Sequence, residues 1–194
     1  MALITKNLLD KSLRQDVVSG NAGLLLALTK LFETDHKNSQ SVKILMSQCF
    51  SIIESRGYEN KVFKNWDYQQ NKKLLGFSHG SSGILYALSR YLPYKQIGEN
   101  VSKIISDILF YEEKLFDMQN LNWPDYRFED SDLQVVSWCH GATGIGMSRF
   151  QLYKTNLFFE ESVRDIKRAL DKTVQTGAHF LDTLCCGNSG RIDF

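Results

Sequence analysis

Apolar residues recur every three or four positions over long stretches of this chain, which is the spacing of an amphipathic helix. Such stretches cover residues 42–53, 97–108 and 163–174. No alternation of apolar and polar residues is long enough to indicate a strand, and prolines stand only at Pro93 and Pro124. The pattern predicts a nearly all-helical protein.

Four Gly-x-x-Gly steps divide the helical stretches and open shorter, more uniformly apolar runs. The steps begin at Gly20, Gly80, Gly141 and Gly187, at spacings of 60, 61 and 46 residues. A recurrence of this kind is an internal repeat, typical of an array in which each unit packs on its neighbour. Each unit is expected to hold an amphipathic outer helix, a glycine turn and an apolar inner helix that starts at or near the second glycine.

Equivalent points of successive repeats meet in space when such an array closes on itself. Glycine suits the turns because it lacks a Cβ and lets neighbouring helix starts approach closely. Residues that stand just before the glycines are therefore candidates for a shared central site. A purely structural role, as a tight helix entry, is the alternative for the step at Gly20. The segment 117–132 interrupts the pattern and is predicted to be a long loop or hairpin.

Composition narrows the classes of function. The chain has 194 residues, of which 43% are hydrophobic, so we expect one globular domain over residues 1–194. A net charge of +1 provides no basic surface for nucleic acid or for an anionic membrane. No segment approaches the roughly 20 apolar residues of a transmembrane helix, and Lys6 and Asp10 interrupt any signal-peptide core, so a cytoplasmic location is expected.

Three of the four cysteines stand at the glycine steps. Cys139 comes two residues before its glycine, and Cys185 and Cys186 directly precede theirs, whereas Cys49 stands apart. Three thiolates at the ends of repeat units can hold one zinc ion in a tetrahedron with an open position. Buried apolar cysteines or a reactive vicinal pair are the alternatives, because the paired Cys-x-x-Cys spacing is absent. Their equivalent places in the repeat favour the metal site.

Three further polar residues hold similar places. His79 directly precedes a glycine, and an ordinary imidazole pKa near 6.5 suits proton transfer at neutral pH. Asp16 is the acidic candidate of the first unit. His140, next to Cys139, is suited to ligate a metal, bind substrate or simply pack. The ordinary alternatives are a backbone-bonded histidine at 79 and a solvated aspartate near a helix end at 16.

Several motifs resemble a known family. They read GFSHG at 76–80, SWCHG at 137–141 and LCCGN at 184–188. Together they resemble the cyclase (LanC-like) domain of lanthionine synthetases, specifically the C-terminal domain of the bifunctional class II enzymes. DVVSG at 16–20 is similar to an acidic motif of an earlier family repeat, and NWPD at 122–125 is similar to the segment before the zinc cysteine. The resemblance covers essentially the whole chain.

The resemblance implies an α/α toroid of inner and outer helices with a zinc ion at its centre. It implies that His79 is the catalytic histidine, that Asp16 is its acidic companion and that His140 lies near the reacting groups. The implied reaction adds a precursor-peptide cysteine thiol to dehydroalanine or dehydrobutyrine and forms a lanthionine or methyllanthionine ring. The zinc ion would bind the thiol of the substrate cysteine as a thiolate at neutral pH. The implied zinc ligands are Cys139, Cys185 and Cys186.

The chain departs from the family pattern in two ways. Some members carry an arginine four residues before the zinc cysteine, where this chain has Val135. The enolate that forms when the thiol adds to the dehydro residue is therefore expected to be stabilised by Arg127 or by backbone N–H groups. The resemblance also begins inside the family domain and stops at 190–194, which predicts a partial ring of about four repeats. Such a ring is expected to expose inner-helix residues such as Leu85 and Leu88.

Two readings of function follow from the sequence. The leading one is a zinc-dependent cyclase that acts on a dehydrated precursor peptide, with the missing remainder of the synthetase as a further partner. The alternative is a catalytically incomplete zinc-binding or peptide-binding module. Other α/α-toroid enzymes, such as glycosidases, would need paired carboxylates at the ring centre, and the sequence shows no such cluster.

Overall fold

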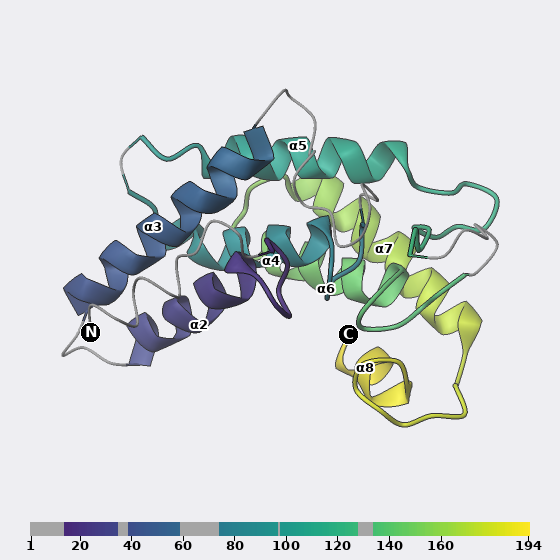
Figure 1. Cartoon of the computed structure of the whole chain (residues 1–194). Coiled ribbons are helices and arrows are strands. Elements are labelled where there is room, and N and C mark those ends of the chain that lie inside the picture. The colour runs from purple at the N-terminus through teal and green to yellow at the C-terminus, as the bar shows by residue number, and fades with distance from the viewer. Residues whose placement is uncertain (1–13, 35–38, 59–73, 97, 128–133) are drawn as a thin grey trace.

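The computed structural model describes residues 14–34, 39–58, 74–96, 98–127 and 134–194 (Figure 1). Within these ranges the chain is helical and forms no strand. This confirms the prediction of an all-α fold. None of the helices there is both long and apolar enough to cross a membrane. The helices are α2 (Asn21–Thr34), α3 (Ser39–Tyr58), α4 (Ser81–Tyr91), η3 (Leu92–Tyr94, a 3-10 helix), α5 (Val101–Lys114), α6 (Ala142–Tyr153), α7 (Phe159–Thr176) and α8 (Asn188–Asp193).

Inner and outer helices alternate along the chain. The inner helices α2, α4, α6 and α8 each follow a glycine step, and the outer helices α3, α5 and α7 come between them. α4 contacts α2, α5 and α6, while α2 pairs with α3 and α6 pairs with α7. Figure 1 shows α4 and α6 in the middle of the molecule, with α3, α5 and α7 around them. Successive inner helices thus bring successive glycine steps side by side.

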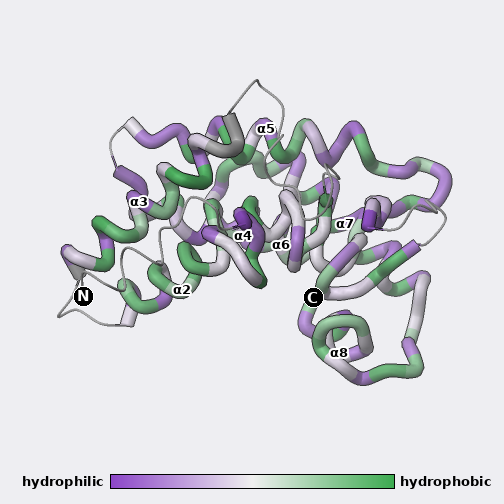
Figure 2. The backbone as a smooth tube through the Cα atoms, viewed as in Figure 1, coloured by the Kyte–Doolittle hydropathy of each residue, from purple (hydrophilic) through white to green (hydrophobic). Residues whose placement is uncertain are grey.

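The main core lies between the first two helix pairs. Leu85 and Leu88 of α4 are fully buried there, in one cluster with Leu25, Met46 and Ile105. The expectation that they would be exposed is wrong, because helices on three sides supply their apolar neighbours. The most exposed apolar side chains are Phe180, in the loop before α8, and Ile192, in α8 itself. Figure 2 shows hydrophobic positions along this C-terminal segment.

Helix α7 turns its apolar stripe away from the core. Val163, Leu170 and Val174 are 43%, 47% and 71% exposed, whereas Asp165 is buried. The reason is that the buried side of α7 supplies Asp165 to Arg149 of α6. The periodicity of residues 163–174 therefore predicts the helix but not the face that it buries.

The glycine steps share one geometry. Each inner helix begins directly after the first glycine, two residues earlier than the sequence predicted. A Cβ on the second glycine of each step would overlap the backbone carbonyl oxygen of the residue six positions earlier. Only glycine allows this approach of loop and helix. The second glycines are Gly23, Gly83, Gly144 and Gly190.

Three of the second glycines also receive a side chain from the preceding repeat. An added Cβ would lie 2.7–2.8 Å from that side chain in each case. The residue at one fixed place in a repeat therefore packs against the glycine of the next repeat, and this contact sets the spacing between adjacent loops. The contacts pair Val17 with Gly83, Phe77 with Gly144, and Trp138 with Gly190.

In the third glycine step, the side chain of Asn122 replaces a backbone hydrogen bond that the other steps make. In the other steps the first helical N–H donates to a carbonyl seven residues earlier, as Ser81 does to Leu74 at 3.0 Å. In the third step the N–H of Ala142 donates to Oδ1 of Asn122 at 3.0 Å, and Nδ2 of Asn122 donates to the carbonyl of Val135 at 3.1 Å. The segment around Asn122 is thereby fixed to the third step. Residues 117–122 form the expected hairpin through backbone hydrogen bonds between Asp117 and Asn122, and 128–132 lie outside the described residues.

A buried ionic network joins the inner and outer helices. The guanidinium of Arg149, fully buried in α6, donates to Glu112 of α5 and, at 3.0 Å, to Asp165 of α7. Glu112 also accepts hydrogen bonds from the hydroxyls of Ser81 and Ser82 at the start of α4. An unpaired charge at this depth would be costly, so these groups hold their helices in a single arrangement. The network fixes the start of α4, directly after the second glycine loop.

Alanine in place of Gly144 is expected to destabilise the fold strongly. The new Cβ would overlap the carbonyl oxygen of Trp138 and lie 2.8 Å from Cβ of Phe77. We expect the free energy of unfolding in urea to fall by about 2–3 kcal/mol, the cost of overpacking. Ser106→Ala, at an exposed position of α5, is the control and should change it by less than about 0.5 kcal/mol. Equal stability of the two variants would contradict the packing argument.

Candidate functional site

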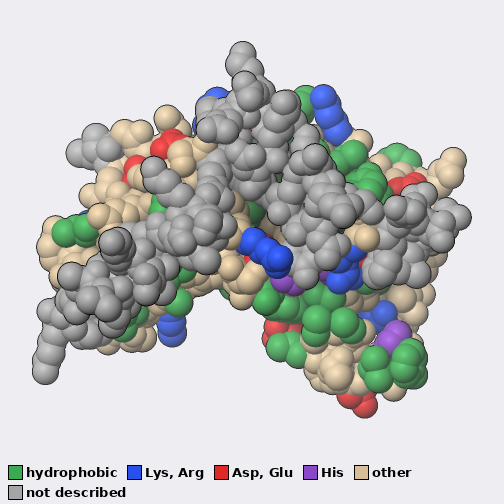
Figure 3. Space-filling view, in the orientation of Figure 1, with side chains coloured by type: hydrophobic (Ala, Val, Ile, Leu, Met, Phe, Trp, Pro, Cys, Tyr) green, Lys and Arg blue, Asp and Glu red, His purple; other side chains and the backbone are tan. Residues whose placement is uncertain are grey.

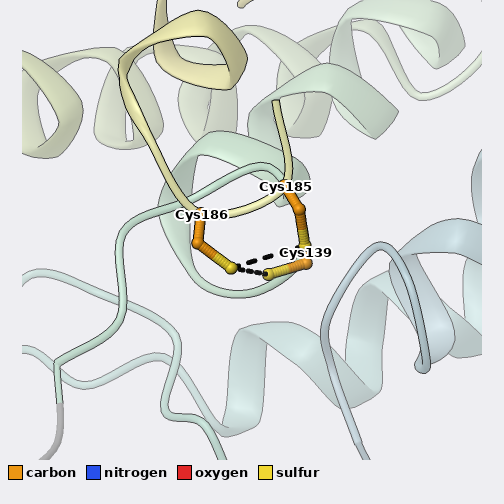
Figure 4. Close-up of side chains that lie close together, drawn as sticks. All are labelled: Cys139, Cys185 and Cys186. Carbon is orange, nitrogen blue, oxygen red and sulfur yellow. Dashed lines mark hydrogen bonds between the residues drawn. The ribbon is translucent and has the colours of Figure 1, made fainter. Parts of the chain in front are cut away.

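The three cysteines of the third and fourth glycine steps converge (Figure 4). Sγ of Cys186 lies 3.7 Å from Sγ of Cys139 and 3.4 Å from Sγ of Cys185. All three sulfurs lie within 4.8 Å of one another. Tetrahedral zinc with Zn–S bonds of about 2.3 Å places its sulfur ligands ~3.8 Å apart. The sulfur triangle therefore has the dimensions of a three-cysteine zinc site.

The two loops that carry these cysteines are bound to each other. The N–H of Cys139 donates to the carbonyl of Cys185 at 3.3 Å, and the hydroxyl of Ser137 lies 3.2 Å from Sγ of Cys139. Burial raises the pKa of the Cys139 thiol, and it raises that of Cys185 to about 12. Thiols with such pKa values hold their protons at neutral pH until a cation displaces them.

His79 is paired with Asp16. Nδ1 of His79 lies 3.1 Å from Oδ2 of Asp16, and the side chains are 19% and 6% exposed. The backbone N–H of Ser19 donates to Oδ1 of Asp16 at 2.6 Å, and the Ser19 hydroxyl lies 3.2 Å from both carboxylate oxygens. Asp16 is therefore not a solvated aspartate at a helix end. A carboxylate on Nδ1 orients an imidazole and sets its tautomer.

His140 lies beside His79 in a more buried place. The two rings stack with their centroids 6.4 Å apart. Nε2 of His140 lies 3.3 Å from the hydroxyl of Ser78, and Nδ1 lies 3.8 Å from Oδ1 of Asp125. Burial lowers the pKa of His140 to about 4 and outweighs the opposing effect of Asp125. The ring is neutral at pH 7.

Gly76 makes the room that His140 occupies. A Cβ at position 76 would overlap the His140 ring and would lie 2.6 Å from the carbonyl oxygen of Cys139. The second and third loops are joined at the same place, because the N–H of Ser78 donates to that carbonyl at 3.1 Å. The glycine of the GFSHG motif therefore positions His140 as well as its own loop.

Asp125 and Arg127 form a charged pair at the site; the sequence suggested Arg127 there but not Asp125. The Asp125 side chain is fully buried and accepts from Nη2 of Arg127 at 2.6 Å and from Nε at 3.0 Å. Burial raises the pKa of Asp125, but the bonds from Arg127 outweigh it and keep the pKa below its usual value. In the sequence, the spacing of Asp125 and Arg127 after Pro124 indicates that the two side chains can pair. It does not indicate that this segment lies beside His140.

The face of the molecule seen in Figure 3 carries basic side chains beside a histidine near its middle, and apolar side chains extend below them. Two exposed apolar residues of the C-terminal part belong to the loop that carries two of the cysteines: Phe180 is 85% exposed and Leu184 is 55% exposed. The loop of Cys185 and Cys186 thus has apolar surface beside its thiols.

The sequence profile described as "Lanthionine synthetase C-like protein" matches residues 2–194. The chain belongs to the lanthionine synthetase C-like family. Among solved structures, nisin cyclase is similar to it with a TM-score of 0.65 and 17% sequence identity. The alignment covers 99% of this chain and 66% of nisin cyclase. This likeness confirms the predicted LanC-like α/α toroid fold.

The structure gathers the residues that the sequence singled out. The Asp16–His79 pair, the His140 ring and the sulfur cluster occupy adjoining loops, because His140 directly follows Cys139 and stacks on His79. The zinc and catalytic roles of these residues stay predictions. Val135 contributes its backbone carbonyl to Asn122 and brings no charge to the site.

The low pKa of His140 predicts a pH dependence of stability. An unfolded chain binds a proton at this histidine near pH 6.5, whereas the metal-free folded protein binds it only near pH 4. The unfolded state therefore holds more protons between these values, and the free energy of unfolding should fall by up to about 3 kcal/mol as the pH drops from 6.5 to 4. Urea unfolding at a series of pH values, with the ring titration followed by NMR, measures this.

His140→Gln is the comparison for that measurement. The variant lacks the titrating ring, so its stability should decline less steeply over the same pH interval. An unchanged slope in His140→Gln would show that other groups cause the decline.

Proposed function

We propose that this chain is a zinc-dependent lanthionine cyclase domain. It would add cysteine thiols of a dehydrated precursor peptide to dehydroalanine or dehydrobutyrine and so form thioether rings. The observation that carries this proposal is a three-sulfur cluster beside a histidine whose Nδ1 is held by a carboxylate. Membership of the lanthionine synthetase C-like family and the likeness to nisin cyclase support it.

Cys139, Cys185 and Cys186 would hold the zinc ion, as in the all-cysteine sites of the class II enzymes that the chain resembles. Zinc bound there would supply the substrate sulfur as a thiolate at neutral pH, where a free thiol with a pKa near 8.5 is mostly protonated. The ligands come from the loops before α6 and α8. The site therefore forms only when the third and fourth repeats are stacked.

His79 would carry the proton. Ring formation makes a bond between sulfur and the β-carbon, while the thiol loses one proton and the α-carbon gains one. The ring of His79 is oriented by Asp16 and is partly exposed, which supports the proposal that it accepts the first proton and returns it to the α-carbon. Asp16 would stabilise the imidazolium that exists between these two transfers.

His140 would line the site as a neutral ring. Its burial keeps it uncharged at pH 7, so it does not compete with His79 for the proton. Ser78 and Asp125 lie at opposite edges of the ring and hold it in place. Its proposed role is to orient the substrate beside His79.

An incomplete zinc-binding or peptide-binding module is the second candidate. It is favoured by the observation that the structural alignment covers 66% of nisin cyclase. In this case the chain would hold zinc and bind peptide, and the remainder of a synthetase would have to complete the reaction.

A dehydrated precursor peptide with free cysteines tests the proposed function. The zinc-loaded protein should consume peptide thiols without changing the peptide mass, because addition within the peptide conserves all atoms. His79→Asn should keep its zinc and lose roughly 10²–10⁴-fold in rate, the usual contribution of a general acid–base group. Zinc binding without thiol loss in the wild type would favour the incomplete module. Full activity of His79→Asn would leave this histidine a structural role.

Zinc content tests the ligand set. Alanine at Cys139, Cys185 or Cys186 should abolish stoichiometric zinc in elemental analysis, because two thiolates and water hold the ion much less tightly. Cys49→Ala is the matched control: this thiol is buried among α2 and α3 and donates to the carbonyl of Asn21. The Cys49→Ala variant should keep stoichiometric zinc. Unchanged metal in all three site variants would contradict the assignment.

A further inference from the structure

The Asp125–Arg127 pair is held rigidly at the site. Asn122 ties this segment to the third glycine step through two hydrogen bonds. Trp123 is 1% exposed and packs edge-on against Phe116, with ring centroids 4.7 Å apart. A segment anchored on both its polar and its apolar side gives Asp125 a fixed position. Fixed supports of this kind are what a preorganised binding group needs.

Asp125 in turn fixes the guanidinium of Arg127. Nε and Nη2 both donate to the carboxylate, and the backbone N–H of Arg127 donates to Oδ1 at 3.1 Å. This fork sets the plane of the guanidinium. The Arg127 side chain is 30% exposed, whereas that of Asp125 is fully buried. The cation therefore reaches the surface of the site, while its counter-ion lies beneath it.

Arg127 also lies within electrostatic reach of the sulfur cluster. Burial lowers the pKa of Arg127, but its hydrogen bonds and charge interaction with Asp125, together with the thiolates that Cys139 and Cys186 form on ionisation, raise it by more. Oδ1 of Asp125, the partner of Arg127, lies 3.8 Å from Nδ1 of His140. The His140 ring in turn stacks on the ring of His79. The guanidinium thus interacts electrostatically with the cysteine cluster, and its partner Asp125 contacts the ring that stacks on His79.

The proposed reaction develops negative charge that a cation in the site would stabilise. When the sulfur lone pair forms a bond to the β-carbon, the carbon–carbon π pair forms a double bond between the α-carbon and the carbonyl carbon, and the carbonyl π pair moves onto the oxygen to give an enolate. Protonation of the α-carbon by His79 uses the enolate double-bond pair, and the carbonyl forms again. A fixed donor at that oxygen stabilises charge that exists only during the reaction.

We propose that Arg127, held by Asp125, binds the carbonyl oxygen of the dehydro residue and stabilises the enolate. This inference rests on the proposed cyclase function and names a substrate-binding cation for it. Asp125 is then a positioning residue, because it acts through the orientation of Arg127.

Arg127→Gln tests the proposal with two readouts. The first is the rate of ring formation with a dehydrated precursor peptide. The second is the uptake of deuterium at the α-carbon of the finished ring in D₂O, which passes through the same enolate. Both should fall by about 10²–10³-fold, as for the loss of one oxyanion donor, while zinc content stays stoichiometric. Calorimetry of the zinc-free protein with the same peptide should show only a few-fold weaker binding.

Companion variants separate charge from structure. Arg127→Lys keeps the charge without the fork and should recover part of both rates; Asp125→Asn should impair both rates without removing zinc. Arg90→Gln is the matched control, because Arg90 pairs with both oxygens of Glu33 at a similar exposure of 33%, and it should leave both rates unchanged. If Arg127→Gln does not fold, partial activity of Arg127→Lys supports the proposal.

Two results would overturn the proposal, and a third concerns the function itself. Wild-type rates of ring formation and deuterium uptake in Arg127→Gln would show that Arg127 does not act on the enolate. Equal losses in Arg127→Lys and Arg127→Gln, accompanied by loss of zinc, would assign Arg127 to the structure of the cluster. A wild-type protein that forms no ring would refute the proposed function, and the Arg127 proposal would fall with it.

Discussion

The site depends on the close approach of a loop carbonyl to the second glycine of each step. This approach sets each loop against the start of its inner helix, and in three steps the same glycine receives a side chain from the repeat before. Asp16, the two histidines and the three cysteines of the site stand within these loops, at most four positions before the first glycine. Groups that are 63 residues apart in sequence, Asp16 and His79, therefore meet on neighbouring loops without any long insertion.

Polar contacts outside the repeat give each loop its individual orientation. Glu112 accepts hydrogen bonds from the first residues of α4 and is itself held by the buried Arg149. Asn122 substitutes its amide for a backbone bond in the third step. Both sets of hydrogen bonds connect a loop of the site to a segment outside the inner helices. The repeat supplies the common geometry, and these contacts allow the second and third loops to carry different chemistry.

The sequence predicted the parts of this structure that local patterns control. Helical periodicity and the glycine steps gave the all-α repeat fold, and the motifs gave the family, because a missing Cβ and a run of apolar positions leave direct traces in the sequence. The helix starts were predicted two residues late, since the first turn forms directly after the first glycine. The burial of Leu85 and the exposure of the apolar side chains of α7 depend on which helices pack alongside. A local sequence pattern does not contain this information.

The same limit applies to the site. Asp125 and Arg127 stand in a segment without repeat spacing, and the Asn122 bonds to the third step together with the packing of Trp123 bring them beside His140. The site then contains two histidines near carboxylates, in contrasting surroundings. His79 is partly exposed and lies 3.1 Å from its carboxylate, whereas His140 is buried and lies 3.8 Å from a carboxylate already committed to Arg127. Burial and the competing arginine both disfavour a charge on His140. The contrast supports the proposal that His79 rather than His140 transfers the proton, because a buried ring that stays neutral at pH 7 is a poor proton donor.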